Sequence, residues 1–243
     1  MKKISVIIPT YNEEKNILLT LKSLTNQNLP REDYEIIIVD GGSTDRTVSL
    51  AGRYADKVIQ QVSEGIGGAR NDGARIAQGE YLATTDADTI IPKYWLSRII
   101  NDFETMKDVV AIGGPIYPRE WTPFNKFFFL MGYNNLPRLL LKISPKLNFF
   151  TFGPNSAFRK EAFFKAGGYS TLGIVDDVEI VRRIKKYGKI YYDLNLIVYA
   201  SARRFEKDGY FRTTLFQNFT TLRLFLLKKD KIEYKGYAKK KYD

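Results

Sequence analysis

Residues 34–45 read YEIIIVDGGSTD, a largely apolar run followed at once by an acidic, glycine-rich turn. An apolar run of this length predicts a buried strand over residues 34–39, and Asp-Gly-Gly predicts the turn that ends it. A similar run, ended by Pro9, lies upstream at residues 4–8. Between the two runs, residues 14–26 carry apolar side chains at helical spacing. Two buried strands separated by a helix indicate a parallel sheet.

The same alternation continues downstream. The patterns predict a helix at 44–54, a strand at 57–62, a glycine-rich turn feeding a helix at 65–79, a strand at 80–85, and helices at 159–166 and 177–187. Strands and helices alternating at roughly 20-residue spacing are typical of βαβ units. The predicted fold class is therefore α/β, with a mostly parallel sheet flanked by helices and a smaller region after about residue 114.

The composition narrows the chemistry. The chain has 243 residues with neither cysteine nor histidine, which excludes disulfides, Cys or His metal ligands, and Ser-His-Asp or Cys-His catalysis. Proton transfer must therefore fall to carboxylates, Lys or Tyr. We interpret the N-terminus as a first strand and not as a signal peptide, because Pro9, Glu13 and Glu14 interrupt it. The missing cysteines fit a reducing compartment and a thermophilic source equally, so they decide little; we expect a cytoplasmic protein.

The charge is strongly basic and unevenly distributed. The net charge is +11, and residues 203–243 hold twelve basic and five acidic side chains. Residues 121–160 contain no acidic residue. An excess of this kind suggests an anionic partner, which could be a nucleic acid, a phosphate-rich ligand or a membrane surface.

Asp86 and Asp88 are candidate metal ligands, because they follow the predicted strand at 80–85 with one residue between them. Two carboxylates at this spacing can hold Mn²⁺ or Mg²⁺ while phosphate oxygens and water complete the coordination. The alternative is a solvated turn whose Asp residues cap a helix. For an isolated D-x-D motif, this alternative is favoured.

Other residues suggest contacts with a nucleotide and an acceptor. Tyr11 could stack on a base, Asp40 could accept a hydrogen bond from it, and Arg70 could pair with a phosphate. Arg203 and Arg204 could clamp a diphosphate, or they could form a solvated basic face. Asp177 could deprotonate a hydroxyl, or it could belong to the first turn of a helix that Asp176 and Glu179 cap as a capping box.

Taken together and in order, these motifs resemble glycosyltransferase family 2, which has the GT-A fold. The resemblance rests on VIIPTYNE at residues 6–13, IVDGGSTD at 38–45, GGARNDG at 67–73, AQGEYL at 77–82, TDAD at 85–88, GPNSAFRKEAF at 153–163, GGY at 167–169 and VDDVE at 175–179. It covers residues 4 to about 205, which implies a GT-A domain at 1–205 and a basic aromatic segment at 206–243. The domain would divide into a nucleotide-sugar-binding half at 1–113 and an acceptor-side half at 114–205.

The resemblance also implies roles for individual residues. Donor-binding residues would be Pro9, Tyr11, Glu13, Asp40, Arg70, Asp86, Arg203 and Arg204; the metal ligands would be Asp86 and Asp88; the acceptor side would include Asn155 and Asp176; and Asp177 would be the catalytic base of an inverting enzyme. The donor would be a nucleotide diphosphate sugar, with UDP favoured over GDP or dTDP, and the acceptor a glycan or a lipid-linked glycan. Two departures stand out. Asp176 replaces the family's usual Glu, and no His is present as a third metal ligand.

Two other classes of protein compete with this interpretation. DADT at 86–89 also resembles the nucleophile motif of haloacid-dehalogenase-like phosphohydrolases, but that motif usually lies on the first strand. A basic nucleic-acid-binding module would fit the net charge, but the chain has no recognised motif of that kind, so we expect no nucleic-acid partner.

The basic and apolar segments suggest one further partner. Residues 124–152 and the tail combine apolar clusters with basic side chains, as suits a protein at the inner face of an anionic membrane. Core packing or a dimer interface explains the same residues equally well, which leaves a homo-oligomer open.

Overall fold

The computed structural model describes residues 2–120, 153–171 and 176–203. Its centre is a seven-stranded sheet in the order β3-β2-β1-β4-β8-β6-β9. The strands are β1 (Ile4–Thr10), β2 (Tyr34–Asp40), β3 (Lys57–Gln60), β4 (Tyr81–Thr84), β6 (Val109–Gly113), β8 (Ser156–Arg159) and β9 (Lys189–Tyr192). The first four pair in parallel, and β8 runs antiparallel to both of its neighbours, β4 and β6. The predicted α/β class and mostly parallel sheet are confirmed.

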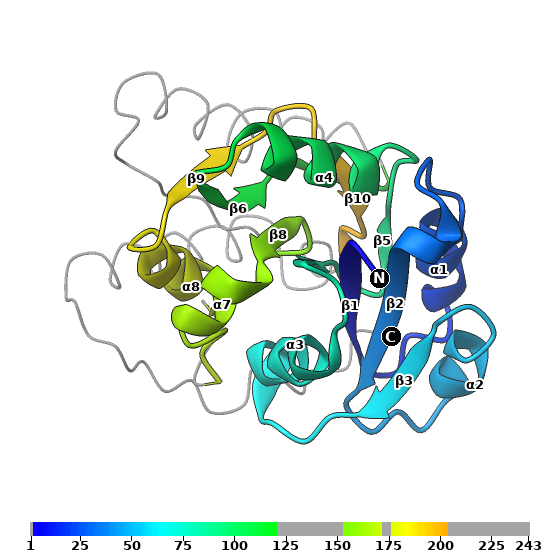
Figure 1. The fold of residues 1–243 in the computed structure, drawn as a ribbon. Helices are drawn as coiled ribbons and strands as arrows, with labels where there is room; N and C mark the ends of the chain where they lie inside the picture. The colour runs from blue at the N-terminus through cyan, green and yellow to red at the C-terminus, as the bar shows by residue number, and fades with distance from the viewer. Residues whose placement is uncertain (1, 121–152, 172–175, 204–243) are drawn as a thin grey trace.

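Helices cover both faces of the sheet (Figure 1). The helices α1 (Ile17–Thr25), α2 (Thr47–Ala51) and α4 (Trp95–Thr105) contribute to one hydrophobic cluster, and α3 (Gly65–Ile76), α7 (Lys160–Lys165) and α8 (Asp176–Ile184) contribute to the other. In β1, Val6 and Ile8 face the first cluster and Ile7 faces the second. The continuous apolar run of β1 therefore reflects burial on both faces, as is usual for a parallel strand.

A smaller, three-stranded sheet lies beside the main one. Its strands are β5 (Thr89–Ile90), β10 (Val198–Ala200) and β7 (Ile116–Pro118), with β10 in the middle. Because Ala200 pairs with Thr89, the end of β10 lies next to the residue that follows Asp88. This sheet therefore brings the residues after position 200 to the D-x-D turn.

The glycine-rich stretch differs from its prediction. We expected a glycine-rich turn that leads into a helix, but α3 begins at Gly65 itself, so these glycines lie in the helix. A Cβ added at Gly73 would lie 2.5 Å from Ile7 Cγ2, and one added at Gly67 would clash with the backbone of Ser170. The glycines allow α3 to pack tightly against β1 and against the segment that precedes α8.

Other predicted boundaries were too wide. The helices predicted at 14–26, 44–54 and 177–187 correspond to the shorter α1, α2 and α8, and the strand predicted at 57–62 ends at Gln60. Helix ends fray, and the flanking residues have turn geometry that periodicity alone cannot separate from a helix. The short strands β5 to β10 had no sequence-based prediction.

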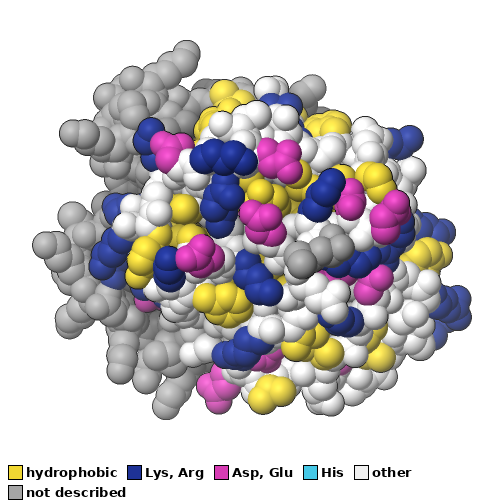
Figure 2. Space-filling view, in the orientation of Figure 1, with side chains coloured by type: hydrophobic (Ala, Val, Ile, Leu, Met, Phe, Trp, Pro, Cys, Tyr) yellow, Lys and Arg dark blue, Asp and Glu magenta, His cyan; other side chains and the backbone are white. Residues whose placement is uncertain are grey.

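Figure 2 shows one face of the molecule, where basic and acidic side chains alternate without forming a large patch of one sign. The apolar segment at 124–152 and the basic tail from residue 204 lie outside the described residues. None of the helices within the described ranges combines the length and the apolar character needed to cross a membrane.

Candidate active site

The candidate site begins where β1 and β2 end. Thr10 pairs with Asp40 in a parallel register, so the loops that follow both strands leave the same edge of the sheet. Asn12, which has a φ of 54°, joins these loops: its N–H donates to Ser43 Oγ at 2.9 Å, and its Oδ1 accepts from the Thr44 N–H at 2.8 Å. Two motifs that are far apart in the sequence are thereby fixed in one rigid edge.

Asp40 shapes this edge. Its buried carboxylate accepts hydrogen bonds from the backbone N–H groups of Gly42 and Ser43 at 3.0 and 2.8 Å, and from Thr10 Oγ1 at 3.2 Å. All of these contacts are made within the protein, so the role of Asp40 in recognising a nucleotide base stays a prediction. Tyr11 has 40% of its surface exposed beside this loop, so its ring is available for stacking, and Pro9 is partly buried within β1.

The D-x-D turn follows β4. The exposed fraction of the side chain is 39% for Asp86 and 16% for Asp88. The Ala87 carbonyl between them accepts a hydrogen bond from Thr20 Oγ1 at 2.8 Å. Each carboxylate has its own cationic partner: Arg70 lies 3.0 Å from Asp86, and Arg203 lies 3.2 Å from Asp88. The turn is held in place, and both of its charges are compensated by guanidinium groups.

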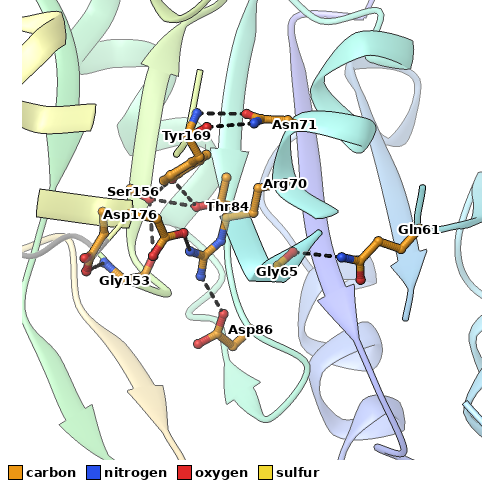
Figure 3. Close-up of polar contacts among 11 residues, drawn as sticks. Gln61, Gly65, Arg70, Asn71, Thr84, Asp86, Gly153, Ser156, Tyr169 and Asp176 are labelled. Atoms are coloured by element: carbon orange, nitrogen blue, oxygen red, sulfur yellow. Dashed lines mark hydrogen bonds and ion pairs between the residues drawn. The ribbon is translucent and has the colours of Figure 1, made fainter. Parts of the chain in front are cut away.

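Arg70 on α3 joins two acidic motifs (Figure 3). One of its terminal nitrogens contacts Asp86, and the other contacts Asp176 at the start of α8 at 3.1 Å. The guanidinium is buried and lies over the Tyr169 ring, 5.2 Å from its centroid. Burial lowers the pKa of Arg70, but the nearby Asp176 and Asp86 carboxylates outweigh this effect and raise it. Arg70 therefore stays charged and fixes the two motifs in one site.

Asn71 fixes Tyr169, whose ring lies against the Arg70 guanidinium. The Asn71 side chain donates to the Tyr169 carbonyl and accepts from the Tyr169 N–H, both at 2.8 Å. Burial raises the pKa of Tyr169 to about 12, so its hydroxyl remains protonated between Thr84 and Ser156. Both residues lie in motifs that carried the family resemblance, yet neither was predicted to belong to the site.

Asp176 corrects one sequence-based interpretation. The capping-box reading is wrong, because Asp176 is the first residue of α8 and its carboxylate pairs with Arg70. Glu179 instead lies 3.9 Å from Arg183 one turn further on. Burial raises the pKa of Asp176, and the Arg70 guanidinium opposes this effect. Its acceptor-side role stays a prediction.

Asp177, the predicted base, lies on the next position of α8. Its Oδ2 accepts a hydrogen bond from the Gly153 N–H at 3.2 Å, and the residue is only partly buried. The neighbouring Asp176 holds Arg70, which also holds Asp86. The candidate base and the candidate metal ligands therefore belong to one connected cluster.

Arg203 and Glu13 form the other side of the cluster. The Arg203 guanidinium donates a hydrogen bond to Glu13, which also accepts one from Asn16 Nδ2 at 3.0 Å. Glu13 and Arg203 were both predicted to bind the donor, and the structure brings them together at Asp88. Arg204 lies outside the described residues.

Arg119 is a site residue that sequence reasoning missed. Its backbone N–H bonds to the Ala200 carbonyl at 2.8 Å, and its guanidinium donates to Asn16 Oδ1 at 3.2 Å. Burial raises the pKa of Asp88 to about 7, with Asp86 and Glu13 adding to the rise while Arg203 and Arg119 oppose it. No motif surrounds Arg119, so only the pairing of β7 with β10 reveals its place.

Asn155 lies apart from this cluster. The side chain is fully buried, accepts a hydrogen bond from Trp95 Nε1 at 2.8 Å, and donates to the carbonyls of Leu196 and Pro115 at 2.6 and 3.2 Å. These bonds tie the start of β8 to α4. The geometry thus gives Asn155 a structural role and offers no support for its predicted contact with an acceptor.

The donor atoms at the D-x-D turn fit Mn²⁺ or Mg²⁺, because both ions prefer oxygen ligands and retain waters. Among the residues that the structure describes, no group of three or more potential protein ligands surrounds one point. Asp86 and Asp88 would thus hold an ion only together with phosphate oxygens and water. The raised pKa of Asp88 marks a buried carboxylate that a cation would stabilise.

Comparison with known proteins places the chain in a family. The model of glycosyl transferase family 2 matches residues 5–166, and the chain belongs to this family. Poly(ribitol-phosphate) beta-glucosyltransferase from Bacillus spizizenii is 33% identical over 215 residues, which cover 78% of this chain and 34% of that protein. The chain thus spans about a third of the length of this relative. The phosphohydrolase and nucleic-acid-binding alternatives are not favoured.

Solved structures share the GT-A fold. Mannosyltransferase PcManGT from Pyrobaculum calidifontis, in complex with GDP-Man and Mn²⁺, superposes with a TM-score of 0.73 and 24% identity, over 94% of this chain and 65% of that one. Residues 1–349 of Staphylococcus aureus TarS, in complex with UDP-GlcNAc, give a TM-score of 0.63 and 24% identity, over 82% and 58% of the two chains. At 24% identity, the similarity to these two structures shows a shared fold and nothing more specific.

Proposed function

We propose that this protein transfers a sugar from a nucleotide diphosphate sugar to an acceptor hydroxyl, with inversion at the anomeric carbon. One observation carries the proposal: Arg70 contacts both Asp86 of the D-x-D turn and Asp176, the neighbour of Asp177. A carboxylate pair suited to a metal and a separate carboxylate suited to a base thus lie on two sides of one guanidinium. An inverting transfer needs such a separation between the leaving group and the base.

Each residue of the site has a distinct role in the proposed reaction. Asp86 and Asp88 would hold Mn²⁺ or Mg²⁺, which supplies Lewis-acid stabilisation of the leaving diphosphate when bound. Arg203 lies next to Asp88 and offers a second positive charge to the phosphates. Asp177 removes the proton of the acceptor hydroxyl as that oxygen attacks the anomeric carbon. Glu13 orients Arg203, and Tyr169 and Asn71 orient Arg70.

The nucleoside would lie at the edge formed by the ends of β1 and β2. The exposed Tyr11 ring can stack on a base, and the loop fixed by Asp40 presents backbone groups to it. We favour a UDP-sugar, and a GDP- or dTDP-sugar is compatible with the same contacts. Among the similar structures, TarS was crystallised with UDP-GlcNAc and PcManGT with GDP-Man.

For the acceptor we propose a glycan or a lipid-linked glycan. The relative from Bacillus spizizenii is named a poly(ribitol-phosphate) beta-glucosyltransferase, and the compound in that name is a polymer. A lipid-linked acceptor would place the enzyme at the inner face of a membrane, where the basic residues of the tail would contact anionic lipids.

Calorimetric titration with UDP-, GDP- and dTDP-sugars, with and without Mn²⁺, tests the proposal. We expect one nucleotide class to bind, and to bind more tightly when Mn²⁺ is present. If no nucleotide sugar binds in the presence of the metal, the proposed function is wrong.

A further inference from the structure

Arg203 is paired with Asp88, one of the two candidate metal ligands. Its guanidinium lies 3.2 Å from Asp88 Oδ2 and also donates a hydrogen bond to Glu13. All three side chains are partly buried: 30% of the side-chain surface is exposed for Arg203, 16% for Asp88 and 14% for Glu13. Because the contact is partly buried, water and salt screen it less than they screen a surface ion pair.

The backbone around Arg203 fixes this position. Thr89, which follows Asp88, pairs with Ala200 across β5 and β10. The Arg203 N–H donates to Ser201 Oγ at 3.3 Å, and the Arg119 N–H closes the other edge of β10 on the Ala200 carbonyl. The pairing of β5 with β10 therefore determines which cationic side chain faces the D-x-D turn.

Asp88 cannot serve this guanidinium and a divalent ion equally well. A bound Mn²⁺ needs a direct bond of about 2 Å to a carboxylate oxygen, and it repels a guanidinium held beside the same carboxylate. The free protein, in contrast, gains by compensating Asp88 with Arg203, because an unpaired buried carboxylate is costly. The two cations thus compete for one anion.

We propose that Arg203 is an internal counter-ion of Asp88, which competes with the divalent metal until the diphosphate of the donor draws Arg203 away. This inference rests on the proposed function, since it needs a diphosphate-bearing ligand at the same turn. It makes metal and nucleotide binding mutually dependent: the nucleotide strengthens metal binding, and by linkage the metal strengthens nucleotide binding by the same factor. The metal alone binds weakly, so the site loads fully only when the donor is present.

The test is a Mn²⁺ titration followed by electron paramagnetic resonance, without nucleotide, on the wild-type protein and on Arg203→Gln. Removal of the competing charge should tighten Mn²⁺ binding by about tenfold, within the usual range of coupling between two ligands, and the further gain caused by added UDP or GDP should shrink. Arg46→Gln is the matched control, because it removes one Arg paired with Glu14 on an exposed surface. This control should bind Mn²⁺ as the wild type does.

Arg203→Lys separates charge from geometry. It keeps the positive charge but loses the two-pronged guanidinium, so its Mn²⁺ affinity should fall between those of the wild type and Arg203→Gln. This variant also carries the test if Arg203→Gln does not fold.

Two results overturn the inference in distinguishable ways. If the wild type binds Mn²⁺ in the presence of UDP or GDP, yet the Arg203 variants bind Mn²⁺ alone no more tightly than the wild type, the counter-ion role is wrong and the proposed function stands. If neither the wild type nor the Arg203 variants bind Mn²⁺ even with nucleotide, both the metal site of the proposed function and the counter-ion role of Arg203 are wrong.

Discussion

Arg70 and Asp176 form a buried ion pair, with 3.1 Å between Nη1 and Oδ2, across 106 positions of the sequence. The pair fastens α3 to the first residue of α8 and thereby sets the position of Asp177. It therefore contributes both to the stability of the fold and to the geometry of the candidate site.

Replacing Arg70 should test the structural part of this role. Arg70→Met leaves the Asp176 carboxylate buried without its partner, which should lower the free energy of unfolding by about 3 kcal/mol. Urea denaturation measures the change. Arg46→Met, at an exposed pair, should cost less than about 1 kcal/mol. A similarly small loss for Arg70→Met would show that Asp176 needs no cationic partner.

Asp102 should make stability depend on pH. Burial raises its pKa to about 6, the neighbouring Asp193 carboxylate adds to the rise, and among the described residues its Oδ2 has no hydrogen-bond partner. In the unfolded chain the pKa of an Asp is about 3.9. The folded protein therefore binds this proton more tightly than the unfolded chain does. Stability should fall as the pH rises from about 4 to about 6, and this contribution should stay constant above that range.

The variant Asp102→Asn removes this penalty. It should be more stable than the wild type by up to about 3 kcal/mol at pH 8, because about two pKa units at about 1.36 kcal/mol each separate the folded and unfolded states, and nearly equal to it at pH 4, as measured by urea denaturation at both values. Asp108→Asn is the control, because the hydrogen bond from Lys189 lowers the pKa of Asp108, so that variant should gain nothing at pH 8. An equal gain for Asp102→Asn at both pH values would contradict the titration of Asp102.

The early part of the fold could be predicted because its signals are local. The strands β1, β2 and β4 are short apolar runs separated by helical patterns, and each is buried on both faces. The placement of β8 between β4 and β6 could not be predicted in this way. It depends on antiparallel pairing between Thr84 and Ser156, which are 72 positions apart.

The site was predictable only where a motif marked it. Asp86 and Asp88 stand out as paired carboxylates after a strand, whereas Arg119 lies in no pattern and is found only through the register of β7 with β10. The spacing of Asp176 and Glu179 suggests a capping box, but it carries no information on whether Asp176 forms an ion pair with a distant residue. The partner that Asp176 has in the structure, Arg70, lies on another helix.

Asp88→Asn should separate donor binding from the metal. The substitution keeps the size of the side chain but removes one of two carboxylates, so Mn²⁺ should no longer strengthen binding of the nucleotide sugar. Calorimetry with and without Mn²⁺ measures the difference. If Mn²⁺ strengthens donor binding in Asp88→Asn as it does in the wild type, the metal does not bind at the D-x-D turn.

The basic tail should make membrane binding depend on lipid charge. Residues 203–243 have a net charge of +7, and each basic side chain near an anionic surface adds about 1 kcal/mol. In liposome flotation the full chain should rise with anionic vesicles at low salt, less with neutral ones, and partly detach at high salt. Equal flotation with both kinds of vesicle, or none with either, would leave the tail without this role.

Asp177 is the proposed base of the sugar transfer, and Asp177→Asn removes its ability to accept a proton. Release of the nucleoside diphosphate would be followed with Mn²⁺, the donor that binds, and poly(ribitol phosphate) or a lipid-linked glycan as acceptor. Calorimetry would report donor affinity in parallel, with Asp108→Asn as the control at an exposed carboxylate. Turnover should fall by about two to four orders of magnitude while donor affinity stays the same. Turnover near the wild-type value would show that Asp177 is not the base.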